Sequence, residues 1–186
     1  MTTNLYFVRH AHSVYSPDEY HRPLSEQGLH DAQRVTEILK RENIDHVLSS
    51  PYRRAIQTVE GISDYLETEV VIMEDFKERV LADQQIAHFD EAIAKVWADE
   101  QFAWPGGESN QSAKNRGLRA ARQVLESYEG QNVVIGTHGN IMVLIMNAFD
   151  CQYDFRFWKQ LAMPDLYKLS FEGAVLKAVE RLWDQP

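Results

Sequence analysis

Residues Met1–Ser13 have the sequence MTTNLYFVRHAHS. The apolar run from Leu5 to Val8 predicts a strand that is buried on both faces, as in a parallel sheet. This run stops abruptly at Arg9 and His10, where the strand is expected to end. Because ligands bind at the carboxyl ends of strands in open α/β sheets, the pair indicates either a binding site or, more simply, a strand that surfaces into a basic loop.

Strand and helix patterns alternate along the rest of the chain. Further strands are expected over Val47–Leu48, Val70–Met73 and Asn132–Gly136, and helices from Ser25 to before Asn43, over Arg54–Leu66, Ile86–Trp97 and Ser109–Tyr128, and in a short apolar segment ending at Asn147. Near the carboxyl end, Leu166–Phe171 and Val175–Leu182 flank Glu172-Gly173 and predict a β-hairpin. This order predicts an α/β fold, a three-layer α/β/α sandwich with a mostly parallel sheet and an antiparallel edge hairpin.

Length, charge and cysteine content limit the classes of protein. The 186 residues suit a single domain over 1–186, and the net charge of −9 argues against nucleic acid or an anionic membrane as a partner. The one cysteine, Cys151, excludes an internal disulfide, fits a reducing compartment and is expected to be buried or half-buried. Because the sequence shows neither a signal-peptide pattern nor an apolar run of membrane-spanning length, we expect a cytoplasmic protein.

Basic residues and histidines follow three of the predicted strands. Arg9-His10 comes after the first, Arg53-Arg54 after the second and His138 after the strand NVVIG. Since the carboxyl ends of parallel strands share one edge, these groups are expected to converge there, and a cluster of cations in an acidic protein suits a phosphate. Helix N-termini behind Pro51 and Gly139 are expected to add backbone donors.

At this point the sequence resembles the histidine phosphatase superfamily, in its phosphoglycerate-mutase-like branch. The resemblance covers nearly the whole chain and is carried by six motifs in the expected order. These are VRHAHS (8–13), RPLSEQG (22–28), SSPYRRAIQT (49–58), FKER (76–79), PGGES (105–109) and VIGTHGN (134–140). Each motif alone is weak, but the six together, each at an expected strand or helix boundary, form a specific signal.

The resemblance implies a role for individual residues. His10 is expected to be the nucleophile that takes the phosphoryl group, and Glu78 to protonate the leaving oxygen and then activate water. The expected phosphate-binding residues are Arg9, Arg54, His138, Ser16, Gly139 and Asn140, and His138 is expected to be catalytic as well. Ser16 stands where the family commonly has an asparagine, so this shorter side chain is expected to hold the phosphate only partly. Because arginines supply the positive field, neither a metal nor a cofactor is expected.

Several alternatives stay open at the level of sequence. Glu78 lies in the charged stretch EDFKER, which is also typical of a solvated surface. The His10-x-His12 pattern is found in metal-dependent amidohydrolases as well, although this chain is short for their barrel. A cofactor-dependent phosphoglycerate mutase and a catalytically silent phospholigand-binding protein are the other functions considered. We favour a phosphatase, because a mutase must enclose its intermediate away from water and this chain is shorter than the glycolytic mutases.

Substrate choice is expected to depend on a cap segment at about 76–108. This segment has three cations, Lys77, Arg79 and Lys95, among more numerous acidic residues and several aromatic ones. It therefore predicts few cations to spare for a second anionic group and a preference for small phosphomonoesters with a partly apolar leaving group. The expected partner is a small-molecule substrate, and the chain is expected to be a monomer or a homodimer.

Overall fold

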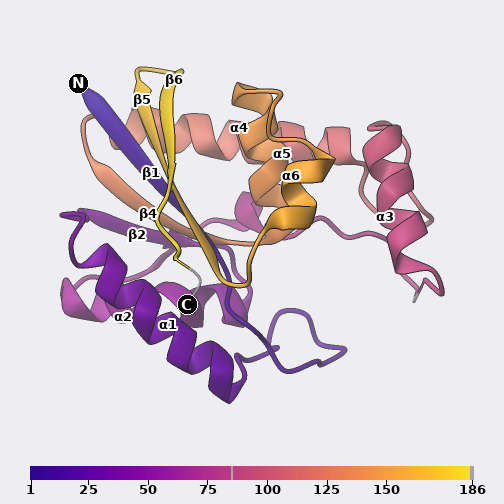
Figure 1. The fold of residues 1–186 in the computed structure, drawn as a ribbon, viewed down its shortest axis with the longest axis horizontal. Helices are drawn as coiled ribbons and strands as arrows, with labels where there is room; N and C mark the ends of the chain where they lie inside the picture. Colours follow the sequence, from indigo (N-terminus) through magenta and orange to yellow (C-terminus); the bar gives the residue numbers. More distant parts are fainter. Residues whose placement is uncertain (85, 185–186) are drawn as a thin grey trace.

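The sheet is the centre of the structure, a computed structural model that describes residues 1–84 and 86–184. Its strands are β1 (Thr2–Arg9), β2 (His46–Ser49), β3 (Val71–Ile72), β4 (Asn132–Thr137), β5 (Asp165–Glu172) and β6 (Val175–Arg181). They pair in the order β3-β2-β4-β1-β5-β6 (Figure 1). The first four strands in this order run parallel, whereas β5 is antiparallel to β1 and β6 to β5. The predicted parallel sheet with an antiparallel edge hairpin is confirmed.

Strand β1 lies between two strands from distant parts of the chain. Leu5 is opposite Val133 of β4 on one side and Leu169 of β5 on the other. This central position explains why Leu5–Val8 is apolar without alternation, since helices cover both faces of a central parallel strand. The register also places Arg9 opposite Thr137, so that both strands end at the same edge of the sheet.

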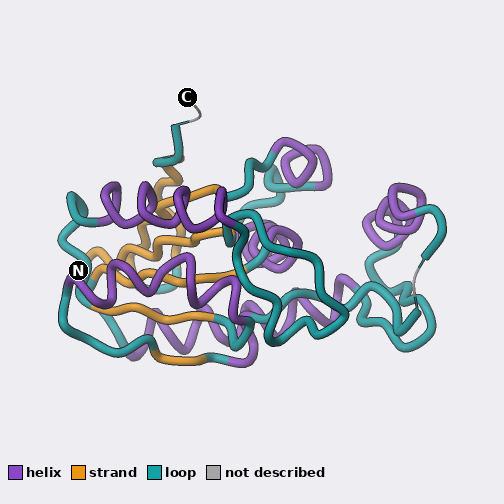
Figure 2. Tube along the Cα trace, turned by 90° about the horizontal axis from the view of Figure 1, so that it is seen from below, coloured by secondary structure: helices purple, strands orange, loops and turns teal. Residues whose placement is uncertain are grey.

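Helices cover both faces of the sheet. They are α1 (Glu26–Leu39), α2 (Arg53–Tyr65), α3 (Phe89–Ala98), α4 (Asn110–Ser127), α5 (Gly139–Phe149) and α6 (Phe155–Gln160), with a short 3₁₀ helix, η1 (Glu74–Phe76). Tyr6 and Val8 of β1 pack in one apolar cluster with residues of α1 and α2, while Leu5 and Phe7 pack in another with residues of α4 and α5. Figure 1 shows α1 and α2 on one side of the sheet and α4 and α5 on the other, with α3 beyond the end of the sheet (Figure 2). The predicted α/β/α sandwich is thus confirmed.

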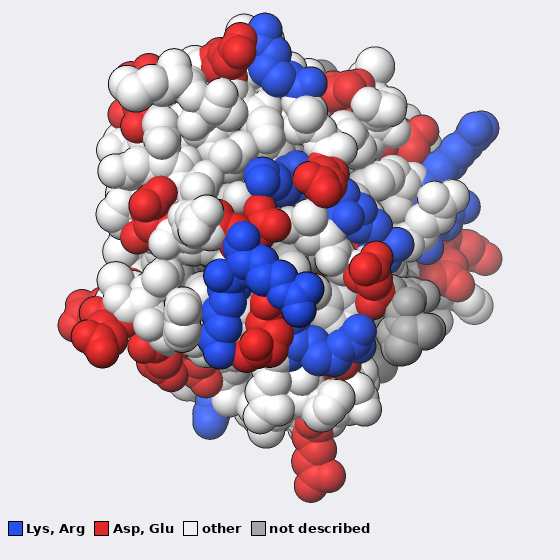
Figure 3. Space-filling view, turned by 60° about the vertical axis from the view of Figure 1, so that its left-hand side comes forward, with Lys and Arg blue, Asp and Glu red and all other residues white. Residues whose placement is uncertain are grey.

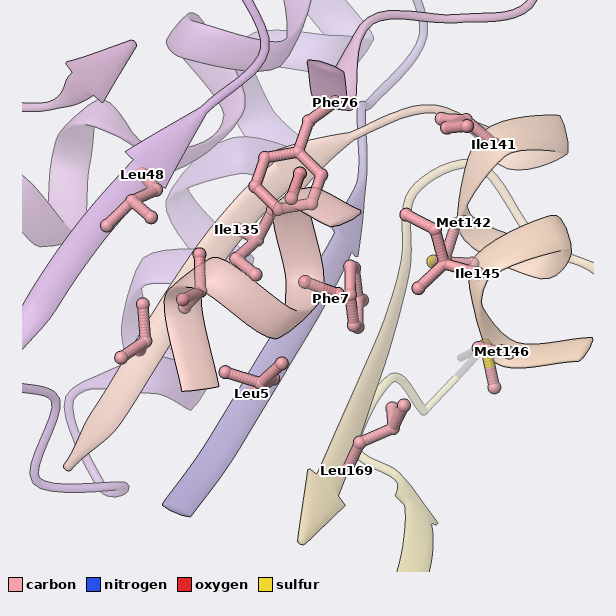
Figure 4. Close-up of a cluster of buried hydrophobic side chains, with 14 of the residues drawn as sticks. Leu5, Phe7, Leu48, Phe76, Ile135, Ile141, Met142, Ile145, Met146 and Leu169 are labelled. Carbon is pink, nitrogen blue, oxygen red and sulfur yellow. The ribbon is translucent and has the colours of Figure 1, made fainter. Parts of the chain in front are cut away.

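The larger apolar cluster joins the sheet to α4 and α5. Phe7, Phe76, Ile135 and Met142 are fully buried in it, and the rings of Phe7 and Phe76 meet edge to face at 6.3 Å (Figure 4). Burial of such a side chain contributes about 1.5–3 kcal/mol. Because Phe76 is the first residue of the FKER motif, this anchor fixes where the following charged residues leave the core.

The boundaries of the elements agree with the sequence patterns, with a few differences. Ser25 and Ser109 cap α1 and α4 by accepting from the backbone N–H of Gly28 and Ser112. The expected strand Val70–Met73 shortens to the exposed edge strand β3, and α6 and η1 were not predicted. The expectation of a buried Cys151 was wrong, because this thiol is exposed in the turn after α5.

The surface combines both signs of charge. On the face drawn in Figure 3, Lys and Arg side chains lie interleaved with Asp and Glu side chains. Within the described ranges 1–84 and 86–184, the structure contains no helix that is both long and apolar enough to cross a bilayer.

Candidate active site

Three loops meet at the carboxyl-end edge of the sheet. The backbone N–H of His10, after β1, donates to the carbonyl of Thr137 at 3.0 Å, and that of Ser50, after β2, donates to the carbonyl of Gly136 at 2.8 Å. The loop after β4 continues directly into His138 and α5. The convergence expected from the three strand ends is therefore present in the fold.

A cavity of about 510 Å³ opens at this edge. It is lined by Arg9, His10, His12, Ser13, Glu19, Arg22, Arg54, Glu78, Arg79, Leu81, Phe89, Ile93, Gly139, Asn140, Trp158 and Met163. Four guanidinium groups and two carboxylates face it, so the cavity carries an excess of positive charge in a protein with a net charge of −9. This local excess suits an anionic ligand.

His10 is held with one ring nitrogen available for bonding to phosphorus. Its Nδ1 lies 2.7 Å from the carbonyl oxygen of Ala11, which can only accept, so Nδ1 carries the proton. The unprotonated Nε2 then accepts from Nε of Arg54 at 3.2 Å. Burial, followed by the charge of Arg54, lowers the pKa of His10 to about 3. The ring is thus neutral near pH 7, as a nucleophile must be.

Arg54 is engaged on both sides of its guanidinium group. This side chain is 3% exposed, and besides His10 it contacts Glu19, with Nη1 donating to the backbone carbonyl at 2.9 Å and Nη2 to the carboxylate at 3.0 Å. The same carboxylate pairs with Arg22. Glu19 therefore ties together two arginines at the end of the cavity where His10 lies.

Arg9 and Gly139 depend on each other. Nη1 of Arg9 donates to the carbonyl of Ala162 at 2.9 Å, whereas its buried Nε has no acceptor among the described residues. A Cβ on Gly139 would lie 2.9 Å from that Nε, so glycine at this position lets the guanidinium group approach the N-terminus of α5. Arg9, a predicted phosphate-binding cation, and Gly139, a predicted backbone donor, are thus neighbours.

His138 lies behind His10 rather than on the cavity wall. It is fully buried, its ring centre is 5.2 Å from that of His10, and its Nε2 lies 2.7 Å from the hydroxyl of Ser50. Burial, together with His10 and the nearby arginines, lowers the pKa of His138 well below its usual value. Its Nδ1 is buried and finds no partner within the described ranges.

The Glu78 carboxylate sits at the N-terminus of α5. Its Oε2 accepts from the backbone N–H of Asn140 at 3.0 Å, and its Oε1 accepts from those of Ile141 at 3.0 Å and Arg79 at 2.8 Å. Glu78 is consequently a fixed wall residue and not a solvated surface acid. The N–H of Asn140 points at this carboxylate, and the Asn140 side chain contacts Trp97 and Asn110.

The structure gathers six of the eight predicted site residues on the cavity wall and His138 directly behind it. Ser16 is not among the lining residues, and its hydroxyl accepts from the backbone N–H of Asp18 at 3.2 Å. The sequence did not single out Glu19, Arg22 and Trp158 as wall residues. Arg22 belongs to the RPLSEQG motif, which was the signal available for it. Among residues 1–84 and 86–184, no three His, Cys, Asp or Glu side chains are grouped as metal ligands.

Comparison with known proteins identifies the family. The family model of the histidine phosphatase superfamily (branch 1) matches residues 5–181, and the chain belongs to this superfamily. It is 31% identical over 117 residues to the uncharacterized phosphatase PhoE of Bacillus subtilis, a match covering 63% of this chain and 59% of that protein. It is 31% identical over 131 residues to phosphoglycerate mutase-like protein 4 of Arabidopsis thaliana, covering 64% and 56%. Each match thus spans less than two thirds of the relative.

Solved structures share the fold at low sequence identity. A phosphoserine phosphatase mutant from Entamoeba histolytica, in complex with phosphoserine, has a TM-score of 0.78 at 19% identity and covers 95% of this chain and 96% of its own. A mycobacterial glucosyl-3-phosphoglycerate phosphatase has a TM-score of 0.76 at 20% identity, with 97% of each chain covered. These likenesses establish the α/β/α architecture.

Proposed function

We propose that this protein is a metal-independent phosphatase that hydrolyses small phosphomonoesters through a phosphohistidine intermediate on His10. The observation that carries the proposal is the fixed tautomer of His10, whose Nδ1 donates to Ala11, so that the unprotonated Nε2, which accepts from Nε of Arg54, is the nitrogen that can bond to phosphorus. A neutral, oriented imidazole among guanidinium groups matches what nucleophilic phosphoryl transfer requires. The relatives named as phosphatases, of phosphoserine and of glucosyl-3-phosphoglycerate among others, support the same reaction class.

The first step forms the phosphoenzyme. Nε2 of His10 attacks phosphorus, the bond between phosphorus and the ester oxygen breaks, and Glu78 in its acid form gives that oxygen a proton. Arg9 and Arg54 stabilise the negative charge on the phosphoryl oxygens, provided that Arg54 exchanges its bonds to Glu19 and to Nε2 of His10 for the phosphate, which frees the attacking lone pair. His138, neutral and buried against His10, keeps the nucleophilic ring in place.

The second step releases phosphate. The Glu78 carboxylate takes a proton from water, the water oxygen bonds to phosphorus, and the bond to Nε2 of His10 breaks. The three backbone N–H donors on Glu78 fix the position of the carboxylate for both proton transfers. Gly139 and Asn140 contribute the positive end of α5 at the same wall.

We further propose that residues from about 76 to 108 act as the cap of a single domain. Arg79, Leu81, Phe89 and Ile93, all within this segment, face His10 across the cavity. Phe89 and Ile93 come from α3, which extends past the sheet edge. Their apolar side chains offer a surface to the alcohol part of a substrate.

The proposal is tested by trapping the intermediate. Mixing the protein with p-nitrophenyl phosphate labelled on phosphorus and quenching in alkali is expected to leave label on His10 that is stable to base and labile to acid. Turnover is expected to continue in the presence of a chelator. A silent binding protein turns over nothing, a mutase transfers the label to phosphoglycerate when that acceptor is added, and label on serine or aspartate would overturn the mechanism.

A further inference from the structure

Arg116 is a buried side chain of α4 that uses every N–H of its guanidinium group. It is 7% exposed and is not among the residues that line the cavity. Its Nε donates to Oε1 of Glu108 and its Nη2 to Oε2, each at 2.8 Å. The other bonds go to backbone carbonyls: Nη1 donates to Asp75 at 2.7 Å and Lys77 at 2.9 Å, and Nη2 to Glu78 at 3.3 Å. An arginine has five N–H groups, so no donor of this side chain is left over.

The three carbonyls belong to the segment that carries Glu78 from the core to the cavity. Phe76 in the same segment is fully buried, and its carbonyl accepts from Oγ1 of Thr137 at 2.9 Å. Side chains of α4 and β4 therefore hold the successive carbonyls of residues 75, 76, 77 and 78. Because a 3₁₀ helix as short as η1 closes few hydrogen bonds of its own, these contacts determine where the main chain of Glu78 lies.

Glu78 is consequently fixed at both ends. Its carboxylate accepts from the backbone N–H groups of Arg79, Asn140 and Ile141. Its own backbone carbonyl accepts from Arg116. A general acid has to lie within hydrogen-bond reach of the oxygen that it protonates, and a displacement of about 1 Å can lower the rate by about 10²-fold. A bond that fixes the main chain of Glu78 therefore bears directly on proton transfer.

The PGGES motif explains how Arg116 is oriented. The carboxylate of Glu108, in this motif, binds the guanidinium group through both oxygens, which sets the plane of the group. The backbone N–H of Glu108 donates to the carbonyl of Val80 at 2.8 Å. A Cβ on Gly107 would lie 2.1 Å from the carbonyl oxygen of Leu81, so glycine is needed for this close approach. The motif thus attaches the start of α4 to the chain that follows Glu78.

We propose that Arg116 is a positioning residue that holds Glu78 where it exchanges protons with the leaving oxygen and with water. This rests on the proposed phosphatase function. The charge of Arg116 has a separate effect, because burial, followed by His10, Arg54 and then Arg116, lowers the pKa of His138. A test of the positioning role therefore has to change the hydrogen bonds of Arg116 and keep its positive charge.

Arg116→Lys meets this condition. Lysine keeps the charge but has three donors on a single nitrogen, so it cannot hold Glu108 and three carbonyls together. Rapid-quench single turnovers measure phosphoenzyme formation with an alkyl phosphate and with p-nitrophenyl phosphate. The rate is expected to fall by about 10–100-fold with the alkyl ester and by less than about threefold with the aryl ester, because nitrophenolate leaves with little help from a proton. Arg119→Lys, on the exposed face of the same helix, is the matched control and is expected to leave both rates unchanged.

The double variant with Glu78→Gln separates positioning from a general loosening of the fold. If Arg116 acts through Glu78, adding Arg116→Lys to Glu78→Gln is expected to change the ratio of the aryl rate to the alkyl rate by less than about twofold. A merely structural role would slow both esters alike in the single variant and would slow both again in the double variant. Either of these results overturns the proposal.

Glu108→Gln is the second variant and decides the question if Arg116→Lys does not fold. It keeps Arg116 and weakens the pair that orients it, so a smaller loss confined to the alkyl ester is expected. A loss that is equal on both esters, or no loss at all, overturns the role of Arg116. No turnover of either ester by the wild-type protein is a different result, which overturns the phosphatase function and this role with it.

Discussion

The two ends of the cavity differ in how their charged groups are satisfied. At the end where His10 lies, Ala11 and Arg54 hold His10 and Glu19 holds Arg54, although buried nitrogens of Arg9 and His138 have no partner among the described residues. At the cap end, Nε and Nη1 of Arg79 are buried without a hydrogen-bond partner among the described residues, and the wall also includes apolar side chains such as Leu81. The His10 end therefore holds its nucleophile in a fixed network, whereas the cap end combines an unpaired cation with apolar side chains.

This difference separates chemistry from selection. Phosphoryl transfer depends on positioning and charge stabilisation, so a network that fixes His10 favours rate for any ester. The cap wall is proposed to contact the alcohol part instead, which is where phosphate esters differ from one another. Changes at the phosphate end are therefore expected to affect all substrates alike, and changes at the cap end to depend on the alcohol.

The largest effect is expected for His10→Ala. Loss of the nucleophile is expected to lower kcat by more than about 10²-fold for every ester, with no phosphoenzyme formed. Stopped assays with p-nitrophenyl phosphate and an alkyl phosphate measure this, with His30→Ala on the exposed face of α1 as the control. Residual activity above a hundredth of the wild-type kcat would mean that another residue attacks phosphorus.

Glu78→Gln is expected to lower kcat much more for esters with a poor leaving group than for esters with a good one. An alkyl ester needs a proton on its departing oxygen, so its kcat should fall by about 10²–10⁴-fold, while nitrophenolate leaves with little help. The ratio of the two kcat values is the measurement, and Glu74→Gln on the exposed η1 helix is the matched control. Equal losses on both substrates would assign the acid role to a different group.

Stability is expected to fall as the pH drops below about 6.5. His10 has a pKa of about 3 in the folded protein and an ordinary one when unfolded, so between these values only the unfolded chain takes up the proton. The neutral His10 ring makes its full contribution to the free energy of unfolding above about pH 6.5. This contribution is lost toward pH 3 at up to about 1.4 kcal/mol per pH unit. Urea unfolding of wild type and His10→Gln across this range should show the smaller slope in the variant. Parallel slopes would show that His10 is not neutral in the fold.

The smallest effect is expected for Glu19→Gln. The Glu19 carboxylate holds Arg22 and Arg54, the groups a phosphate must engage, and an amide competes for them less strongly. Inorganic phosphate is therefore expected to inhibit the variant several-fold more tightly, with Asp18→Asn on the same loop as the control. Weaker inhibition would instead make Glu19 the residue that positions Arg54.

Local pattern was enough to predict the framework of the site. The end of the Leu5–Val8 run, the second strand before Ser50 and the NVVIG strand before His138 together fixed where basic groups converge, because parallel strands end at one edge. The serine caps at Ser25 and Ser109 were visible for the same local reason.

The cap and its partners depend on contacts between distant residues. Arg79 in the stretch EDFKER looks like a surface residue, and only the packing of Phe76 and the cap against α4 and α5 buries it. The pairing of Glu19 with Arg54 joins a loop to the first turn of α2, and no periodic pattern in the sequence indicates it. Cys151 is exposed because the turn after α5 turns outward, which composition alone does not indicate.

The central place of β1 has a consequence for how the protein is made. The strands that pair with β1 are synthesised long after it. Asn4 bonds to Asn132, which lies 128 residues further along the chain, and β5 follows still later. At about 5–20 residues per second, a ribosome needs roughly 6–26 s to add the residues that separate the two asparagines. Throughout that time the apolar segment Leu5–Val8 has no strand to pair with in the nascent chain. We therefore expect slow folding with high contact order, in which chaperones that bind short apolar segments raise the yield.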